Sequence, residues 1–224
     1  MTQKVDFLTK DGVRISAVFD PASRPGPAAL LLHMMPATKE SWSAAGFTQL
    51  LVKAGFSVLA VDLRGHGESR TAADGRQLDY MLFGDREHQA KMLDVEAAAA
   101  WLRENAGVTE DKLAVVGASI GANLSIAFAA AHAHVPATVA LSPGMDYRGV
   151  TTPDKVRRLG SGQSLFLAAS SDDELSFQTD RRLAEMKPDS LVKEYDGAGH
   201  GTTMFERRPE LMGEIVAWLK EKTG

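Results

Sequence analysis

A serine flanked by two glycines carries the strongest chemical signal in the chain. Residues 117–121 read Gly-Ala-Ser-Ile-Gly, after a β-branched run and before an alanine-rich segment typical of a helix. A sharp turn from strand to helix brings backbones close together, and Gly117 and Gly121 would avoid a collision there. Such a turn exposes the Ser119 hydroxyl and points free helix N–H groups at the same spot. We therefore predict that Ser119 is a nucleophile; the alternative is a glycine-rich turn with a solvated serine.

A serine hydroxyl is a weak nucleophile and needs a neighbouring base. His200 lies in the glycine-rich stretch 196–201, just after the last predicted strand, where a flexible loop can bring an imidazole over the serine. The other five histidines are His33, His66, His88, His132 and His134. We expect structural hydrogen bonds from the first two and a solvated third. The last two, two residues apart on a helix, point about 200° apart, which argues against a shared metal ion.

An orienting carboxylate completes such a site because it fixes the tautomer of the base. Residues 171–174 read Ser-Asp-Asp-Glu, between another predicted strand and His200. Asp173 is the first candidate, Asp172 the second, and Asp146, after the preceding strand, the third. The other acids of this run are expected to face solvent.

The elements that would position these groups alternate between strand and helix, which indicates an α/β fold with a mostly parallel sheet covered on both faces. A hairpin around Asp11-Gly12 starts the chain. The eight predicted strands are 4–9, 13–19, 28–33, 57–62, 113–116, 137–142, 164–170 and 191–195. The predicted helices are 40–54, 85–105, 120–133, 178–186 and 210–222. Active groups in such sheets lie beyond the carboxyl ends of the strands, where all the candidates fall.

The order Ser119, Asp173, His200 resembles that of the α/β-hydrolase family. Three further segments resemble family motifs: His-Met-Met-Pro at 33–36 its oxyanion loop, Asp-Leu-Arg-Gly-His-Gly-Glu-Ser at 62–69 its D-x-R-G-x-G-x-S loop, and 167–173 its strand leading to the acid. The resemblance covers nearly the whole chain, as one domain over residues 1–224. It implies a serine triad and backbone oxyanion donors at Met35 and Ile120. Met34 departs from the pattern, because the family usually has glycine there.

The substrate region is expected to be open. Only 21 positions, 143–163, separate two predicted strands where many family members insert a cap, so a full cap domain is not expected. Residues 78–83, in the longer loop after residues 62–64, are a candidate for a partial lid. Met34, Met145 and Met204 are the predicted substrate contacts. Met35, Trp42, Tyr147 and Phe205 also lie near strand ends, and about half of these seven are expected to be core residues.

Composition excludes several classes of protein. The chain has 224 residues with 44% hydrophobic and 24% charged side chains, as in an average globular protein, and its net charge of -4 does not favour nucleic acid as a partner. It has no cysteine, so thiolate metal sites and a cysteine nucleophile are excluded, and no metal or other cofactor is expected. Residues 113–145 lack charges but contain too many polar and turn residues for a membrane span. Without the apolar core of a signal peptide in residues 1–11, a cytoplasmic protein is expected. The sequence leaves the oligomeric state open.

These observations predict a serine hydrolase that cleaves small-molecule carboxylic esters of short to medium acyl chains. A thioesterase, a lysophospholipase or a peptidase would use the same three residues. A non-catalytic binding protein on the same scaffold is the alternative from another class, and a complete triad argues against it.

Overall fold

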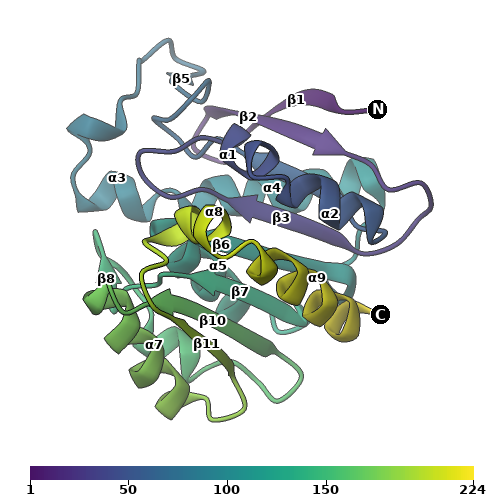
Figure 1. Cartoon of the computed structure of the whole chain (residues 1–224). Coiled ribbons are helices and arrows are strands. Elements are labelled where there is room, and N and C mark those ends of the chain that lie inside the picture. Colours follow the sequence, from purple (N-terminus) through teal and green to yellow (C-terminus); the bar gives the residue numbers. More distant parts are fainter.

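Eight strands lie side by side in the main sheet of the computed structural model, which describes all 224 residues (Figure 1). Their order is β1-β2-β4-β3-β6-β7-β10-β11, and the short β5 (Thr71–Ala72) pairs with β2 off this path. β2 runs antiparallel to β1 and β4, whereas all pairs from β4 to β11 are parallel. The bounds are β1 Gln3–Leu8, β2 Val13–Asp20, β3 Ala28–Leu32, β4 Ser57–Val61, β6 Leu113–Ala118, β7 Ala137–Leu141, β10 Ser164–Ser170 and β11 Leu191–Tyr195. The predicted mostly parallel, eight-stranded sheet is confirmed.

Helices cover both faces of the sheet and divide its apolar residues into two cores. One core receives α4 (Met92–Ala106), α5 (Ile120–Ala131) and α7 (Glu174–Met186), and the other receives α2 (Phe47–Lys53) and α9 (Glu210–Thr223). In Figure 1, α2 and α9 lie in front of the sheet. Because side chains alternate along a strand, Leu30 and Leu32 of β3 enter the first core while Ala29 and Leu31 enter the second.

Two helices expected to be continuous are broken. The predicted helix 40–54 divides into α1 (Glu40–Ala44) and α2, because Gly46 between them has a φ of 84°. The predicted helix 85–105 divides into α3 (Asp85–Gln89) and α4. There the N–H groups of Lys91, Leu93 and Asp94 donate to carbonyls three residues back instead of four, which tightens the chain into a 3₁₀-like turn.

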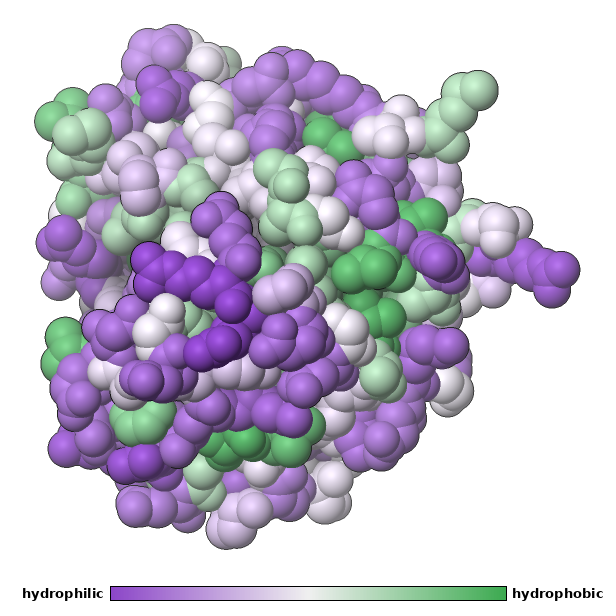
Figure 2. Space-filling view, in the orientation of Figure 1, coloured by the Kyte–Doolittle hydropathy of each residue, from purple (hydrophilic) through white to green (hydrophobic).

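No separate cap covers the carboxyl ends of the strands. Between β7 and β10 the chain forms only the small hairpin of β8 (Asp146–Tyr147) and β9 (Val150–Thr151) and the short α6 (Pro153–Val156). The remaining short helices are η1 (Tyr80–Leu82), η2 (Glu110–Lys112), η3 (Gly201–Thr203) and α8 (Met204–Arg207). The surface in Figure 2 is largely hydrophilic, with an apolar patch at its upper left over η1, where Met81 and Leu82 are exposed. No helix combines the length and apolar character needed to span a membrane.

The turn from β6 to α5 leaves no room for a side chain at either of its glycines. A Cβ atom on Gly117 would lie 2.0 Å from the Gly121 carbonyl oxygen, and one on Gly121 would lie 2.2 Å from the Leu32 carbonyl oxygen of β3. Both obstacles are backbone atoms, which cannot rotate away as a side chain can. Glycine at these two positions is therefore a steric requirement of the fold.

Replacing Gly121 with alanine should lower the free energy of unfolding by about 3 kcal/mol or more, because α5 must move away from β3. Gly213→Ala in α9 is the matched control: no atom lies within 4 Å of its added Cβ. It should raise stability by up to about 1 kcal/mol, the helix propensity gained. Urea unfolding of both variants measures the difference, and equal effects would contradict the steric argument.

Candidate active site

Ser119 occupies the turn between β6 and α5 in a backbone conformation that is rare for a residue with a side chain. Its φ is 55° and its ψ is -121°. Its N–H donates to the Leu141 carbonyl of β7 at 2.8 Å, and its carbonyl accepts from the Ala122 N–H at 2.9 Å. The turn is therefore fixed on both sides, and the half-buried Ser119 side chain is held at the carboxyl end of the central strand β6. Strain of this kind is typical of functional positions.

His200 and Asp173 form a direct pair beyond the ends of β10 and β11. The His200 Nδ1 lies 2.6 Å from the Asp173 Oδ2. Burial would raise the pKa of Asp173, but hydrogen bonds with His200, Ser176 and Ser142 outweigh it and hold that pKa below its usual value. Asp173 therefore remains ionised and accepts the Nδ1 proton, which leaves the His200 Nε2 unprotonated when the ring is neutral.

The other two candidate carboxylates have different partners. Asp172 accepts hydrogen bonds from the Ser170 hydroxyl and, at 3.1 Å, from the Gly199 N–H, so it braces the loop that carries His200. Asp146 is exposed and accepts from the Gly149 N–H at 2.6 Å within the β8–β9 turn. Of the three acids, only Asp173 touches the imidazole.

The His200 loop packs directly against the serine turn. A Cβ atom on Gly201 would lie 3.4 Å from the Ala118 Cβ, and the Gly201 N–H donates to the Ser142 hydroxyl at 2.9 Å. Ser142 directly follows β7, the strand whose Leu141 carbonyl also holds Ser119. No hydrogen bond joins Ser119 to His200 in this structure. Such contacts commonly tighten only when a substrate is bound.

The backbone N–H groups at the two predicted oxyanion positions have no acceptor within the chain. The Met35 N–H makes no hydrogen bond within the chain. Ile120 is the first residue of α5, so its N–H is one of the amides that a helix leaves without an intrahelical partner. Its side chain is fully buried, which anchors this amide. Both groups can donate to a substrate oxygen.

The loop after β3, which carries Met35, is fixed by hydrogen bonds at both ends. The His33 Nδ1 donates to the Met34 carbonyl at 2.8 Å, and its Nε2 accepts from the Leu63 N–H at 3.0 Å. Those two bonds determine the tautomer of a neutral imidazole. Burial lowers the pKa of His33 to about 4, so the ring stays neutral at pH 7. The predicted structural role of His33 is confirmed by these contacts.

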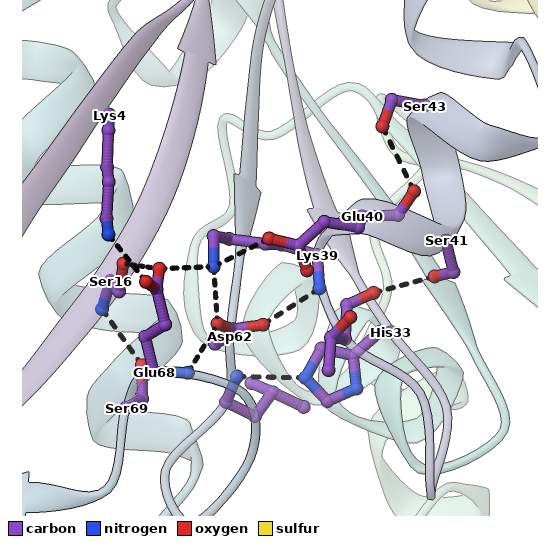
Figure 3. Close-up of polar contacts among 12 residues, drawn as sticks. Lys4, Ser16, His33, Lys39, Glu40, Ser41, Ser43, Asp62, Glu68 and Ser69 are labelled. Atoms are coloured by element: carbon purple, nitrogen blue, oxygen red, sulfur yellow. Dashed lines mark hydrogen bonds and ion pairs between the residues drawn. The ribbon is translucent and has the colours of Figure 1, made fainter.

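A buried ion pair at Lys39 holds the far end of the same loop (Figure 3). The Lys39 Nζ lies 2.6 Å from the Asp62 Oδ2 and 2.9 Å from both the Glu68 and the Glu40 carboxylates. The Lys39 N–H also donates to the Asp62 Oδ1 at 2.9 Å. Lys39 and Asp62 are almost completely buried, so the pair is shielded from water. Sequence reasoning missed Lys39, because only the fold brings residue 39 to the D-x-R-G-x-G-x-S loop.

The D-x-R-G-x-G-x-S loop, residues 62–69, is also tied to the rest of the molecule through Arg64. Its side chain donates to both Asp11 oxygens, at 2.7 and 2.9 Å, and to the Asp94 Oδ1 at 2.8 Å. His66 is buried, contacts the Arg64 carbonyl through Nδ1 at 3.1 Å and stacks on Tyr80. Both residues hold loops together, which is the structural role predicted for His66.

The prediction of a solvated His88 is wrong. The ring is 2% exposed, because the break between α3 and α4 turns it inward against Phe83. Beside it Lys91 is completely buried, and its Nζ lies 3.6 Å from the Met35 Sδ. Burial lowers the pKa of Lys91 to about 7. A signal for its burial was present: Lys91 shares one helical face with Val95, Ala98 and Leu102, spaced four, seven and eleven residues on.

A tyrosine adjoins the serine from the β8–β9 hairpin. The Tyr147 hydroxyl lies 3.0 Å from the Ser176 Oγ. Burial raises the pKa of Tyr147, and hydrogen bonds with Ser176 and Ser119 oppose that rise. The sequence placed Tyr147 only among apolar pocket candidates. The structure adds its hydroxyl as a polar neighbour of the predicted nucleophile.

The three predicted substrate-contacting methionines have different environments. Met145 lines a cavity of about 440 Å³ together with Tyr147 and Leu175. Met34 is half-buried and packs against the His200 loop, with its Sδ 3.8 Å from the Thr202 Oγ1. The prediction that Met204 contacts the substrate is wrong. Met204 has no exposed surface, because α8 packs it into the core with Trp42 and Phe205. Met204 is therefore not proposed as a substrate contact.

Comparisons with known proteins agree with this fold. A family model described as the alpha/beta hydrolase fold matches residues 27–159. The chain belongs to the α/β-hydrolase family. Among solved structures, the esterase Pf2001 of Pyrococcus furiosus superposes with a TM-score of 0.82 at 20% identity, covering 100% of this chain and 93% of that one. A thermostable carboxyl esterase from Bacillus coagulans gives 0.77 at 13% identity, with 100% and 99% covered. These likenesses show the fold.

The curated relatives are longer than this chain. Polyketide transferase grgF of a Penicillium species is 27% identical over 179 residues, which cover 75% of this chain and 58% of that protein. Thiohydrolase aneE of Aspergillus aculeatus is 25% identical over 224 residues, covering 97% of this chain and 63% of that protein. The chain thus spans about three fifths of the length of these relatives.

The buried His88 should make stability depend on pH. Burial lowers its pKa to about 4, whereas an unfolded histidine titrates near 6.5. Below pH 6.5 the unfolded chain therefore binds a proton that the folded chain does not, and stability falls toward pH 4. His88→Gln should flatten the slope of unfolding free energy between pH 6.5 and 5 by up to about 1.4 kcal/mol per pH unit.

Urea unfolding at several pH values measures that slope. His134→Gln, at an exposed position, is the control and should leave it unchanged. A slope in His88→Gln equal to that of the unmodified chain would show that folding does not lower the pKa of His88.

Proposed function

We propose that this protein is a serine hydrolase of carboxylic esters, with Ser119 as nucleophile, His200 as base and Asp173 as the carboxylate that orients it. The observation that carries the proposal is the 2.6 Å contact between Asp173 and His200 on a loop packed against the strained Ser119 turn. The names of the esterases that share the fold support it further.

The reaction would proceed in two steps. The His200 Nε2 takes the proton of the Ser119 hydroxyl as its oxygen attacks the ester carbonyl. The tetrahedral intermediate then breaks the bond to the alcohol, which leaves with the proton from His200. Water attacks the acyl-serine in the second step, giving its proton to His200, and the carboxylic acid is released as the Ser119 hydroxyl forms again.

The carbonyl oxygen becomes negative in each intermediate, and the N–H groups of Met35 and Ile120 are the proposed donors to it. One such donor typically contributes about 3 kcal/mol to stabilising the transition state. The loop that carries Met35 is held at both ends by His33 and Lys39, so the Met35 N–H would need little reorganisation in the transition state. Met34 and Met145 are the proposed contacts for the small-molecule substrate.

Thioesters are the second substrate class that the comparisons favour, since one relative is named a thiohydrolase. The same nucleophile, base and donors would serve, with a thiol as leaving group. Parallel assays with an oxygen ester and a thioester of the same acyl group separate the two classes.

Ser119→Ala should lower kcat for a 4-nitrophenyl ester by at least about 10⁴-fold, because the acyl-enzyme can no longer form. Thermal unfolding should show that the variant is folded. Retention of most activity in the folded variant would rule out Ser119 as nucleophile, and no turnover of any ester or thioester by the unmodified chain would favour a binding protein.

Asp173→Asn and Asp172→Asn form a matched pair of adjacent, chemically identical changes. Asp173→Asn should reduce kcat by about 10³- to 10⁴-fold, because the amide favours the wrong tautomer of His200. Asp172→Asn should reduce it far less, since Asp172 only braces the loop through Gly199. Steady-state kinetics of both variants decide, and a larger loss in Asp172→Asn would reverse the assignment.

A further inference from the structure

A cavity of about 290 Å³ lies beside Met35, the proposed oxyanion residue. Its apolar and aromatic walls are Met35, Tyr80, Met81 and Phe83. His88 and Arg148 add the polar part of the lining. Three segments far apart in the sequence therefore meet there: the loop after β3, the η1–α3 region and the β8–β9 turn. The volume is at the small end of the range for ligand pockets.

Arg148 brings a positive charge without a partner. Its side chain is exposed and makes no ion pair or hydrogen bond. The nearest acid in sequence, Asp146, instead accepts from the Gly149 N–H at 2.6 Å. The backbone of Arg148 has a φ of 56°, which is costly for a residue with a side chain. The turn thus holds a guanidinium at the cavity although glycine would suit its backbone better.

The inner part of the cavity is also short of negative charge. The His88 ring is 2% exposed, and its Nδ1 has no hydrogen-bond partner. The buried Lys91 lies behind Met35 and has no carboxylate within 4 Å. The carboxylate of Glu87, the residue before His88, instead accepts from the Gly84 N–H at 3.0 Å. Buried polar groups normally have partners, so the unpartnered His88 nitrogen in the lining indicates that a ligand supplies the missing polar contact.

We propose that this cavity binds a carboxylate carried by the substrate, so that the preferred substrates are esters with a second, anionic end. The inference rests on the proposed ester hydrolysis at Ser119. Arg148 would hold the carboxylate, and the walls formed by Met35, Tyr80 and Phe83 would pack on the carbon chain that joins it to the ester. The short β8–β9 hairpin, in the place where relatives of this fold can carry a cap, would then act as the specificity element.

Two pairs of esters test the proposal and show which end of the substrate is bound. On the acyl side, mono-4-nitrophenyl adipate is compared with 4-nitrophenyl 6-methylheptanoate, which replaces the carboxylate by an isopropyl group of similar shape. On the alcohol side, 3-carboxy-4-nitrophenyl butyrate is compared with 3-methyl-4-nitrophenyl butyrate. The quantity measured is the ratio of kcat/KM between the anionic and the neutral ester, after subtraction of spontaneous hydrolysis.

Arg148→Gln should lower this ratio about 10- to 100-fold in one of the two pairs, as expected for loss of a hydrogen-bonded charge partner. Arg148→Lys should retain part of it. Arg158→Gln is the matched control: Arg158 is an exposed arginine on the segment after α6, and its loss should leave the ratio unchanged. A ratio within about twofold of the unmodified chain in both pairs for Arg148→Gln would overturn the inference.

Binding without turnover separates this inference from the proposed function. Calorimetric titration of adipate into Ser119→Ala should give a saturable signal that Ser119→Ala with Arg148→Gln loses. Absence of binding to Ser119→Ala contradicts the carboxylate site even if neutral esters are hydrolysed. Binding that depends on Arg148, together with no turnover of any of the four esters by the unmodified chain, would support the site and contradict ester hydrolysis at Ser119.

Discussion

The contact between the first turn of α5 and β3 is the constraint on which the site depends. Gly121 approaches the Leu32 carbonyl so closely that no side chain fits between them, and Gly117 is equally close to Gly121. This contact makes the chain reverse from strand to helix within one residue, and Ser119 takes up the reversal with its φ of 55°. The same geometry places the Ile120 N–H at the start of a helix beside the serine hydroxyl. The proposed nucleophile and the proposed oxyanion donor are thus positioned by one packing requirement.

The second organising feature is the buried ion pair between Lys39 and Asp62. Moving two charges out of water is costly, so such a pair is weak evidence of net stabilisation, but breaking it by removing one partner is strongly unfavourable. Burial would lower the pKa of Lys39, whereas its hydrogen bonds with Asp62, Glu68 and Glu40 hold that pKa above its usual value. The pair therefore acts as a fixed connection between the loops after β3 and β4. Met35 lies within the first of these loops, between the bonds of His33 and those of Lys39.

Local patterns in the sequence were sufficient for much of this architecture. All eight long strands fell close to their predicted positions. The central parallel strands were recognisable as short apolar runs between turn residues, and β1 and β2 as alternating segments around the Asp11-Gly12 turn. The sequence ranked Asp173 above Asp172, and in the structure only Asp173 contacts His200, whereas Asp172 accepts from the Gly199 N–H. The expectations for His88 and Met204 failed for a shared reason: a break or short helix, invisible in the apolar pattern, turned each side chain inward.

The sequence did not reveal the roles of three basic residues, because those roles depend on contacts with residues far away in the chain. Lys39, Lys91 and Arg148 are ordinary basic residues in the chain, yet one is paired in the interior, one is buried beside Met35 and one stands unpaired at a cavity. Of the three, only Arg148 lines the cavity beside Met35, and its unpaired charge is what suggests a carboxylate-bearing substrate.

The central claim is that the turn at Ser119 makes this one serine reactive. Treatment with a fluorophosphonate, followed by peptide mass spectrometry, tests it directly, and Ser142 is an internal control because it also has a positive φ, of 51°, but is fully buried. The account predicts a single phosphonate adduct, on Ser119, at one per chain. An adduct on Ser142 or another serine, or the absence of any adduct in folded protein that still hydrolyses esters, would contradict it.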